Sequence, residues 1–134
     1  MAPVLVDTSA WIEFLRDTGS STCESVDELI ARKKPLATTD VVIMELLMGA
    51  PDSEARSEIR AFMNRCTMLP VRPLFDYETA AKLYVRCRQN GFTPANTNDL
   101  LVASVAIGQK VPLLAADTDF EHIAAVSPLT LEAA

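Results

Sequence analysis

The sequence predicts an α/β fold, a three-layer α/β/α sandwich around a central, mainly parallel sheet. Short apolar runs of strand length alternate with amphipathic stretches of helical period along the chain. This alternation is typical of βα units, whose strands are parallel and whose helices cover both faces of the sheet. The 134 residues have the size of one domain, and 49% of them are hydrophobic, enough for one buried core. We therefore expect a single domain over residues 1–134.

Five short apolar runs predict the strands. Each is no longer than six residues and is rich in Val, Leu or Ala. Two of the runs end directly at an acidic residue, the first at Asp7 and the fourth at Asp117. In chain order, the predicted strands cover residues 3–6, 36–38, 68–71, 111–116 and 129–131.

Seven stretches predict helices, because apolar residues recur in them at helical spacing. The second has acidic residues early and three consecutive basic residues late, which suits the helix dipole, and Pro35 ends it. In chain order, the predicted helices cover residues 10–15, 21–34, 41–48, 53–65, 77–90 and 99–107, and a short seventh starts at Asp119.

Polar residues stand at the starts of several of these helices. The side chains of Asp, Asn, Ser and Thr at such positions can accept hydrogen bonds from the first free N–H groups of a helix. The expected positions are Ser9 for the first helix, Thr39 or Asp40 for the third, Asp76 for the fifth, and Thr97 or Asn98 for the sixth.

The charge of the chain is unevenly distributed. The net charge of -6 argues against non-specific adhesion to nucleic acid or to acidic lipid. Residues 56–88 are the exception, because they hold seven basic side chains against three acidic ones. If a polyanion binds, we expect this segment to contact its phosphates, although a solvated helix face is the more ordinary interpretation of any one of the bases. The candidate contacts are Arg56, Arg60, Arg65, Lys82, Arg86 and Arg88.

Several features bear on the compartment. The chain holds no apolar stretch near the ~20 residues that cross a bilayer. The short apolar run at the start follows no basic region and is interrupted by Asp7, which argues against a signal peptide. Three well-separated cysteines and a single histidine argue against a disulfide framework or a structural zinc site. We expect a cytoplasmic protein without a membrane partner.

Four carboxylates stand at or inside apolar runs, where an unpaired acid is costly. Asp7 and Asp117 follow two strands, at the edge where parallel sheets place their ligands. Glu45 lies inside the apolar helix over 41–48, and Asp99 begins another apolar helix. Each acid alone could be a helix cap or a turn residue, and Glu45 has the weakest explanation of that kind. Together, and in this βα order, they indicate one site.

The chemistry of this group favours a cation. Carboxylates gathered in one place repel each other, so either their pKa values rise or a cation neutralises them. Hard oxygen ligands, without a set of His or Cys ligands, favour Mg²⁺ or Mn²⁺ over zinc. Asp119 is a further candidate ligand, although it could equally cap the short helix that it begins.

Four segments carry a resemblance to a known family. They are residues 6–12 (VDTSAWI), 39–46 (TDVVIMEL), 98–103 (NDLLVA) and 114–120 (LAADTDF). In these motifs and their order the chain resembles the PIN-domain ribonucleases, and among them the VapC toxins of bacterial VapBC toxin-antitoxin modules. The resemblance covers nearly the whole chain and implies a PIN-like fold.

The resemblance also implies an activity. It suggests an Mg²⁺- or Mn²⁺-dependent endoribonuclease that hydrolyses RNA phosphodiester bonds, leaves a 3′-hydroxyl and a 5′-phosphate, and inhibits translation and growth. The acidic quartet of the family matches Asp7, Glu45, Asp99 and Asp117. In the family, a further acid at the position of Asp119 often joins this site. The supporting residues implied are Ser9, whose hydroxyl would hold Asp7, together with Thr8 and Asn98.

The implied partners are a VapB-type antitoxin and a second copy of the chain. Relatives form homodimers and toxin-antitoxin hetero-oligomers, and the antitoxin holds them inactive. A rival hypothesis is a non-catalytic PIN-like binding module whose acids hold a structural ion. An inactive relative would be expected to lack one of the four acids, whereas this sequence has them all.

Overall fold

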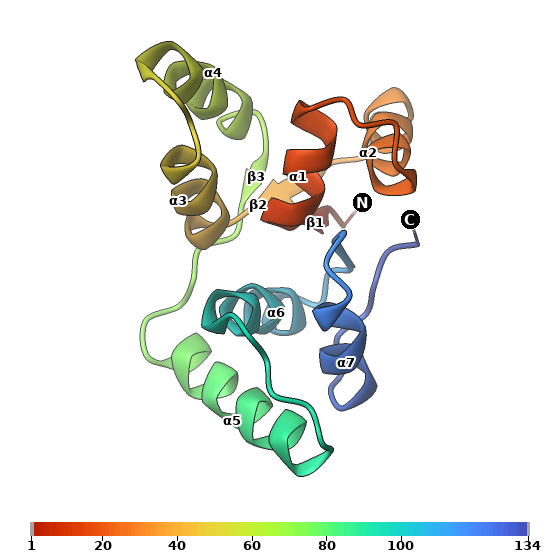
Figure 1. The fold of residues 1–134 in the computed structure, drawn as a ribbon, viewed down its shortest axis with the longest axis vertical. Helices are drawn as coiled ribbons and strands as arrows, with labels where there is room; N and C mark the ends of the chain where they lie inside the picture. Colours follow the sequence, from red (N-terminus) through yellow and green to blue (C-terminus); the bar gives the residue numbers. More distant parts are fainter. Residues whose placement is uncertain (1, 134) are drawn as a thin grey trace.

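A computed structural model describes residues 2–133 and confirms the predicted α/β sandwich (Figure 1). Four parallel strands form one sheet in the order β3-β2-β1-β4. The strands are β1 (Val4–Val6), β2 (Leu36–Thr38), β3 (Thr67–Met68) and β4 (Leu113–Leu114). The helices are α1 (Thr8–Leu15), α2 (Ser21–Ala31), α3 (Asp40–Met48), α4 (Ser53–Met63), α5 (Phe75–Gln89), α6 (Thr97–Gln109) and α7 (Asp119–Ala125).

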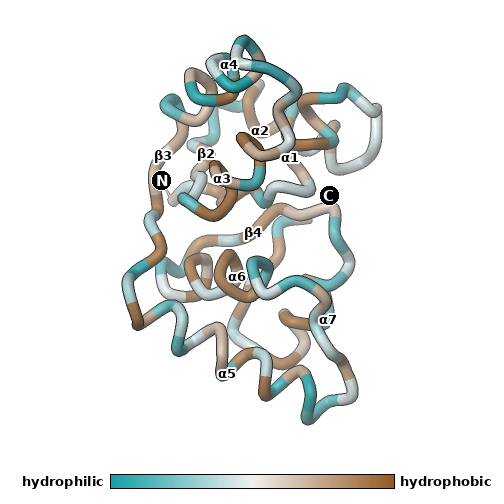
Figure 2. Tube along the Cα trace, turned by 60° about the vertical axis from the view of Figure 1, so that its left-hand side comes forward, coloured by the Kyte–Doolittle hydropathy of each residue, from teal (hydrophilic) through white to brown (hydrophobic). Residues whose placement is uncertain are grey.

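The sheet lies between two groups of helices. In both views α5, α6 and α7 lie on one side of the strands, while α1 to α4 gather toward the other end of the molecule (Figures 1 and 2). Figure 2 shows hydrophobic residues of β4 and α6 running through the middle of the fold. The three residues of β1 are fully buried, as are Trp11 and both residues of β4. Burial on both faces explains why these strands are continuous apolar runs without alternation.

Four of the five predicted strands are shorter than the sequence predicts, and the second has its predicted bounds, Leu36–Thr38. The fourth extends only over Leu113–Leu114, and the predicted last strand at 129–131 is reduced to a single parallel bridge between Leu131 and Leu113. The Leu113 N–H donates to the Thr130 carbonyl at 2.9 Å, and the Glu132 N–H donates to the Leu113 carbonyl at 2.8 Å. The chain end thus covers the outer edge of β4 without forming a strand.

The helix starts differ from the predicted ones in four places, α1, α3, α5 and α6. Asp7, and not Ser9, is the N-cap of α1, and its side chain accepts from the Ser9 N–H. Asn96 caps α6, whose first residue is Thr97, so the prediction of Thr97 or Asn98 as the cap was wrong. Thr39 has the N-cap position of α3, but its side chain makes no cap hydrogen bond.

Asp76 is not the cap of α5 either. The helix begins one residue earlier, at Phe75, and Leu74 at its N-cap has a positive φ of 63°. The buried Asp76 carboxylate instead accepts from the Arg72 backbone N–H at 2.6 Å and from the Arg72 guanidinium at 3.2 Å. The Asp76 carboxylate therefore fixes the turn that leads into α5. Its position near the helix start resembles that of a cap, but its hydrogen bonds go to Arg72.

Helix ends also depart from the predictions. The second helix stops at Ala31, before its three basic residues, because Lys33 has a left-handed φ of 57°. The fourth stops at Met63 and the sixth continues to Gln109. None of the helices within residues 2–133 combines the length and apolarity needed to cross a bilayer.

Candidate active site

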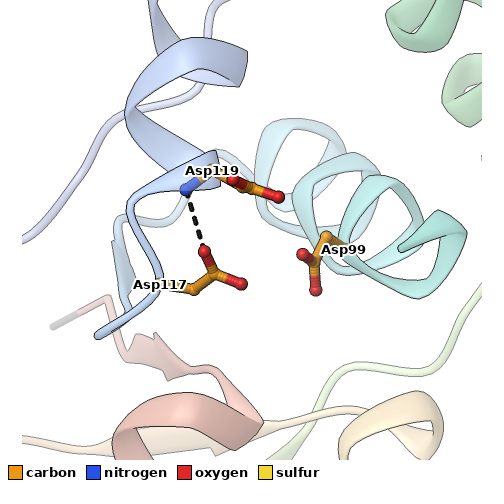
Figure 3. A group of neighbouring side chains, drawn as sticks. All are labelled: Asp99, Asp117 and Asp119. Carbon is orange, nitrogen blue, oxygen red and sulfur yellow. Dashed lines mark hydrogen bonds between the residues drawn. The ribbon is translucent and has the colours of Figure 1, made fainter. Parts of the chain in front are cut away.

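Three aspartates lie together where β4 leads into α7. Asp117 follows β4, Asp119 is the first residue of α7, and Asp99 lies in the first turn of α6. One carboxylate oxygen from each lies within 4.8 Å of the others. Figure 3 shows the three side chains pointing toward a common space. The Asp119 backbone N–H donates to Asp117 Oδ1 at 2.9 Å and so fixes the turn between them.

Asp7 approaches this group from the neighbouring strand. Because β1 and β4 are adjacent and parallel, the residues that follow them lie at the same edge of the sheet. The Asp7 side chain is 3% exposed, and one of its oxygens, Oδ1, has no hydrogen-bond partner among residues 2–133. A buried carboxylate oxygen without a donor is costly, and a cation at this edge would compensate it.

Ser9 links the two strand ends. Its hydroxyl donates to Asp7 Oδ2 at 2.6 Å and accepts from the Ala116 N–H at 3.0 Å. The Ser9 backbone N–H also donates to Asp7 Oδ2, at 3.0 Å. One hydroxyl therefore orients the Asp7 carboxylate and fixes the residue just before Asp117. The Ala116 donor is a main-chain group, so no sequence signal identifies its part in the site.

Glu45 is held from two sides. Thr8 Oγ1 donates to Glu45 Oε1 at 2.7 Å, and Asn98 Nδ2 donates to Glu45 Oε2 at 3.5 Å. These donors come from the first turns of α1 and α6, next to Asp7 and Asp99. The Asn98 side chain is available for this contact because Asn96, two residues earlier, is the cap of α6. Glu45 itself lies outside the group of three aspartates.

The electrostatics of the site follow from burial and from like charges. Burial, as the larger cause, and nearby carboxylates together raise the pKa of Asp99 to about 7. In order of effect, these neighbours are Asp7, Asp117, Glu45 and Asp119. The pKa of Asp7 is raised as well, first by burial and then by the charge of Glu45, against the lowering effect of its bonds from Ser9. The four predicted acids are thus close enough to influence each other's ionisation.

No basic side chain within residues 2–133 forms an ion pair with these acids. The ion pairs of that range are Arg32 with Glu28 and Arg72 with Asp76, neither of which touches the site. A set of carboxylate oxygens without a protein cation, and with one buried oxygen lacking a donor, fits a hard divalent cation such as Mg²⁺ or Mn²⁺.

The six candidate RNA contacts do not form one patch. Arg56 and Arg60 lie on α4, with Arg65 just after it, whereas Lys82, Arg86 and Arg88 lie on α5. The two helices are at opposite ends of the molecule in both views (Figures 1 and 2). Any backbone contacts made by the two sets would therefore involve separate parts of a nucleic acid.

An apolar groove lies between α5 and α6. It has a volume of about 580 Å³, and Tyr77 and Val85 at its rim are more than half exposed. Its other lining residues include Ala81, Tyr84 and Leu101. A groove of this composition is a surface that a partner helix could cover.

Comparison with known proteins gives consistent results. Residues 4–126 match the family model of the PIN domain. The chain is 33% identical over 127 residues to ribonuclease VapC11 of Mycobacterium tuberculosis, covering 94% of this chain and 95% of that relative.

Two solved structures share the fold. The structure of VapBC-1 from nontypeable Haemophilus influenzae superposes with a TM-score of 0.75 at 18% identity, over 98% of this chain and 97% of that chain. Mycobacterium tuberculosis VapC20, a toxin that cleaves the sarcin-ricin loop, superposes with a TM-score of 0.69 at 22% identity, over 95% and 98%.

The raised pKa of Asp99 predicts how the metal-free protein responds to pH. A carboxyl whose pKa is 3.8 unfolded and about 7 folded binds its proton more tightly in the folded state, so its contribution to stability is lost between about pH 4 and pH 7. Asp99→Asn replaces the carboxyl group by an amide that does not ionise, so the variant does not lose this stability as the pH rises. In thermal unfolding with EDTA at pH 8, we expect the variant to melt roughly 5 °C above the unchanged protein.

The matched control is Asp27→Asn, which neutralises an exposed carboxylate on α2. It should leave the melting temperature at pH 8 nearly unchanged. If Asp99→Asn melts at or below the melting temperature of the unchanged protein, burial and repulsion of the Asp99 carboxylate do not destabilise the metal-free fold, and the explanation is wrong.

Proposed function

The chain belongs to the PIN-domain family, and from that premise we propose that it is a metal-dependent endoribonuclease, the VapC toxin of a VapBC-type toxin-antitoxin module. The observation that carries the proposal is the group of acids at one edge of the sheet, with the buried Asp7 Oδ1 left without a donor among residues 2–133. The similarity to a ribonuclease over 94% of the chain supports the same activity.

The aspartates are the residues that would hold the metal. We assign Asp99, Asp117 and Asp119 as ligands, with Asp7 completing the set through its free oxygen. When bound, Mg²⁺ or Mn²⁺ supplies positive charge opposite the phosphate oxygens and makes a nearby water more nucleophilic. The bound cation would balance the negative charge of the aspartates, so that they remain ionised at neutral pH.

Glu45 has a different task in this proposal. Thr8 and Asn98 bind both of its oxygens and fix the direction of its carboxylate. A carboxylate held in this way accepts a proton from the attacking water and aligns that water with the leaving oxygen. Ser9 acts through Asp7 and Ala116, since its hydroxyl sets the spacing of the two strand ends. No side chain needs to form a covalent intermediate.

RNA would be held mainly through its phosphates. Arg56, Arg60 and Arg65 near α4, and Lys82, Arg86 and Arg88 on α5, are exposed or half-exposed bases that can contact a backbone without reading its sequence. Because the two sets lie at opposite ends of the molecule, they suit an extended or folded RNA that spans the acidic site.

The proposal includes partners and a biological role. A VapB-type antitoxin would hold the protein inactive in a toxin-antitoxin hetero-oligomer, and the fold that the chain shares with VapBC-1 is consistent with this. The apolar groove between α5 and α6 supports a homodimer. Freed from its antitoxin, this single PIN domain would cut RNA in the cytoplasm and inhibit translation and growth.

The rival hypothesis is a binding module whose acids hold a structural ion. The two hypotheses differ in what EDTA does. For the nuclease, a chelator stops cleavage without unfolding the protein, whereas a structural ion would take the fold with it when removed.

The direct test is cleavage of a pool of cellular RNA by purified, antitoxin-free protein. We expect discrete fragments with Mg²⁺, none with EDTA, and at least a hundredfold loss of rate in Asp7→Asn, because the variant loses a charged ligand but keeps the shape of the side chain. Asp27→Asn is the matched control and should cleave normally. Cleavage by Asp7→Asn at the normal rate would refute the site, and no cleavage by folded protein would favour the binding module.

The hold on Glu45 gives a second prediction. Thr8→Val removes the hydroxyl that donates to Glu45 but keeps a β-branched side chain of similar size. We expect kcat to fall roughly five- to tenfold, the usual effect of one lost hydrogen bond, with little change in KM.

Thr8→Ser is the control for this test, since it keeps the donor and should restore most of kcat. Equal kcat values for Thr8→Val and the unchanged protein would mean that the Thr8 contact does not orient Glu45 during the reaction.

A further inference from the structure

Two aromatic rings stack at the surface beside α7. The His122 ring lies flat on the Phe92 ring, with centroids 4.2 Å apart and planes 11° apart. Phe92 is half-buried and packs against the core, and its N–H donates to the Cys87 carbonyl at 2.9 Å. The lower ring of the pair is therefore fixed, and the upper ring is supported on one side.

The upper ring has an available face. His122 is exposed although Phe92 covers one side of its imidazole, so its exposed area belongs to the opposite side and to the ring edge. In the part of the chain that the structure describes, the imidazole nitrogens take part in no side-chain hydrogen bond or ion pair. Both the open face and the polar edge of the ring are free to bind.

The pair borders the acidic site. Asp119 and His122 are three residues apart on α7, so they share one face of the helix about one turn, or roughly 5 Å, apart. Asp119 is one of the three clustered aspartates. On the other side, the segment that starts at Phe92 leads within a few residues to Asn96, the cap of α6, and to Asn98, which contacts Glu45.

We propose that the stacked His122–Phe92 pair is a platform for an unpaired nucleobase of the RNA, next to the phosphate that is cut. This inference rests on the proposed nuclease function. Bases that leave a helix stack on aromatic side chains, histidine included, and every base offers a flat face to such a ring.

The charge of the surroundings favours a base over a phosphate at this position. The exposed Glu121 precedes His122 directly on α7 and is not one of the proposed metal ligands, so its charge repels a phosphate oxygen there. The flat face of an uncharged base meets no such repulsion. Stacking would then supply affinity at the point where the RNA backbone approaches the acids.

The test uses a short single-stranded RNA that contains a cleavage site mapped in the cellular RNA pool, together with copies that carry one abasic residue beside the cut. We expect His122→Ala to raise KM about tenfold on intact RNA, with kcat nearly unchanged, and His122→Trp to keep a normal KM. One abasic residue should raise the KM of the unchanged protein by the same factor. It should not raise the KM of His122→Ala any further, because both changes remove the same contact.

A spectroscopic readout separates binding from cleavage. With 2-aminopurine at that position and EDTA present, stacking on the platform quenches the fluorescence, so His122→Ala should lose the quenching and His122→Trp should keep it. Three results for His122→Ala would contradict the platform. The first is a normal KM, and the second is a rise in KM that is equal on intact and abasic RNA. The third is a lowered melting temperature with unchanged quenching. None of these results would contradict the proposed nuclease function. If the unchanged protein cuts no RNA with Mg²⁺, both the nuclease function and the platform are refuted.

Discussion

Mutual repulsion among buried carboxylates is the constraint on which the rest of the site depends. Asp7 and Asp99 are almost fully buried, with Asp117 and Asp119 beside them, and within residues 2–133 no basic side chain pairs with the group. Burial and like charge together raise the pKa of Asp99 to about 7. The repulsion among these carboxylates destabilises the metal-free fold. A divalent cation bound to their oxygens would balance the charge, and carboxylate oxygens are suitable ligands for such a cation.

The fold brings these charges together through the sheet. Adjacent parallel strands β1 and β4 direct Asp7 and Asp117 to one edge, and helices α3 and α6 bring Glu45 and Asp99 to it. Short hydrogen bonds then fix the details, since Ser9 joins the two strand ends and Thr8 reaches Glu45. The strands are very short, but β1 and β4, which carry Asp7 and Asp117 at their ends, are fully buried, so the core holds the frame against the repulsion.

The sequence identifies the acids because each one breaks a local rule. A carboxylate that ends an apolar strand, or that stands inside an apolar helix like Glu45, is visible without a structure. Contacts that depend on the exact path of the folded backbone are not visible in the same way, whether their partners are near or far in the sequence. Asp76 resembles a helix cap but fixes a turn through Arg72, and Asn96 takes the cap that Thr97 or Asn98 was expected to provide. Phe92 and His122, thirty residues apart, gave no signal before the fold stacked them.

The most direct test of the central claim is the binding of Mn²⁺ by the purified protein, measured by titration calorimetry at pH 8 in the absence of RNA. The account predicts saturable binding that weakens at least a hundredfold in Asp99→Asn and is unchanged in Asp27→Asn, because the first change removes a clustered ligand and the second an isolated surface charge. Equal binding by Asp99→Asn and the unchanged protein, or no binding by either, would contradict the assignment of these acids as a metal centre.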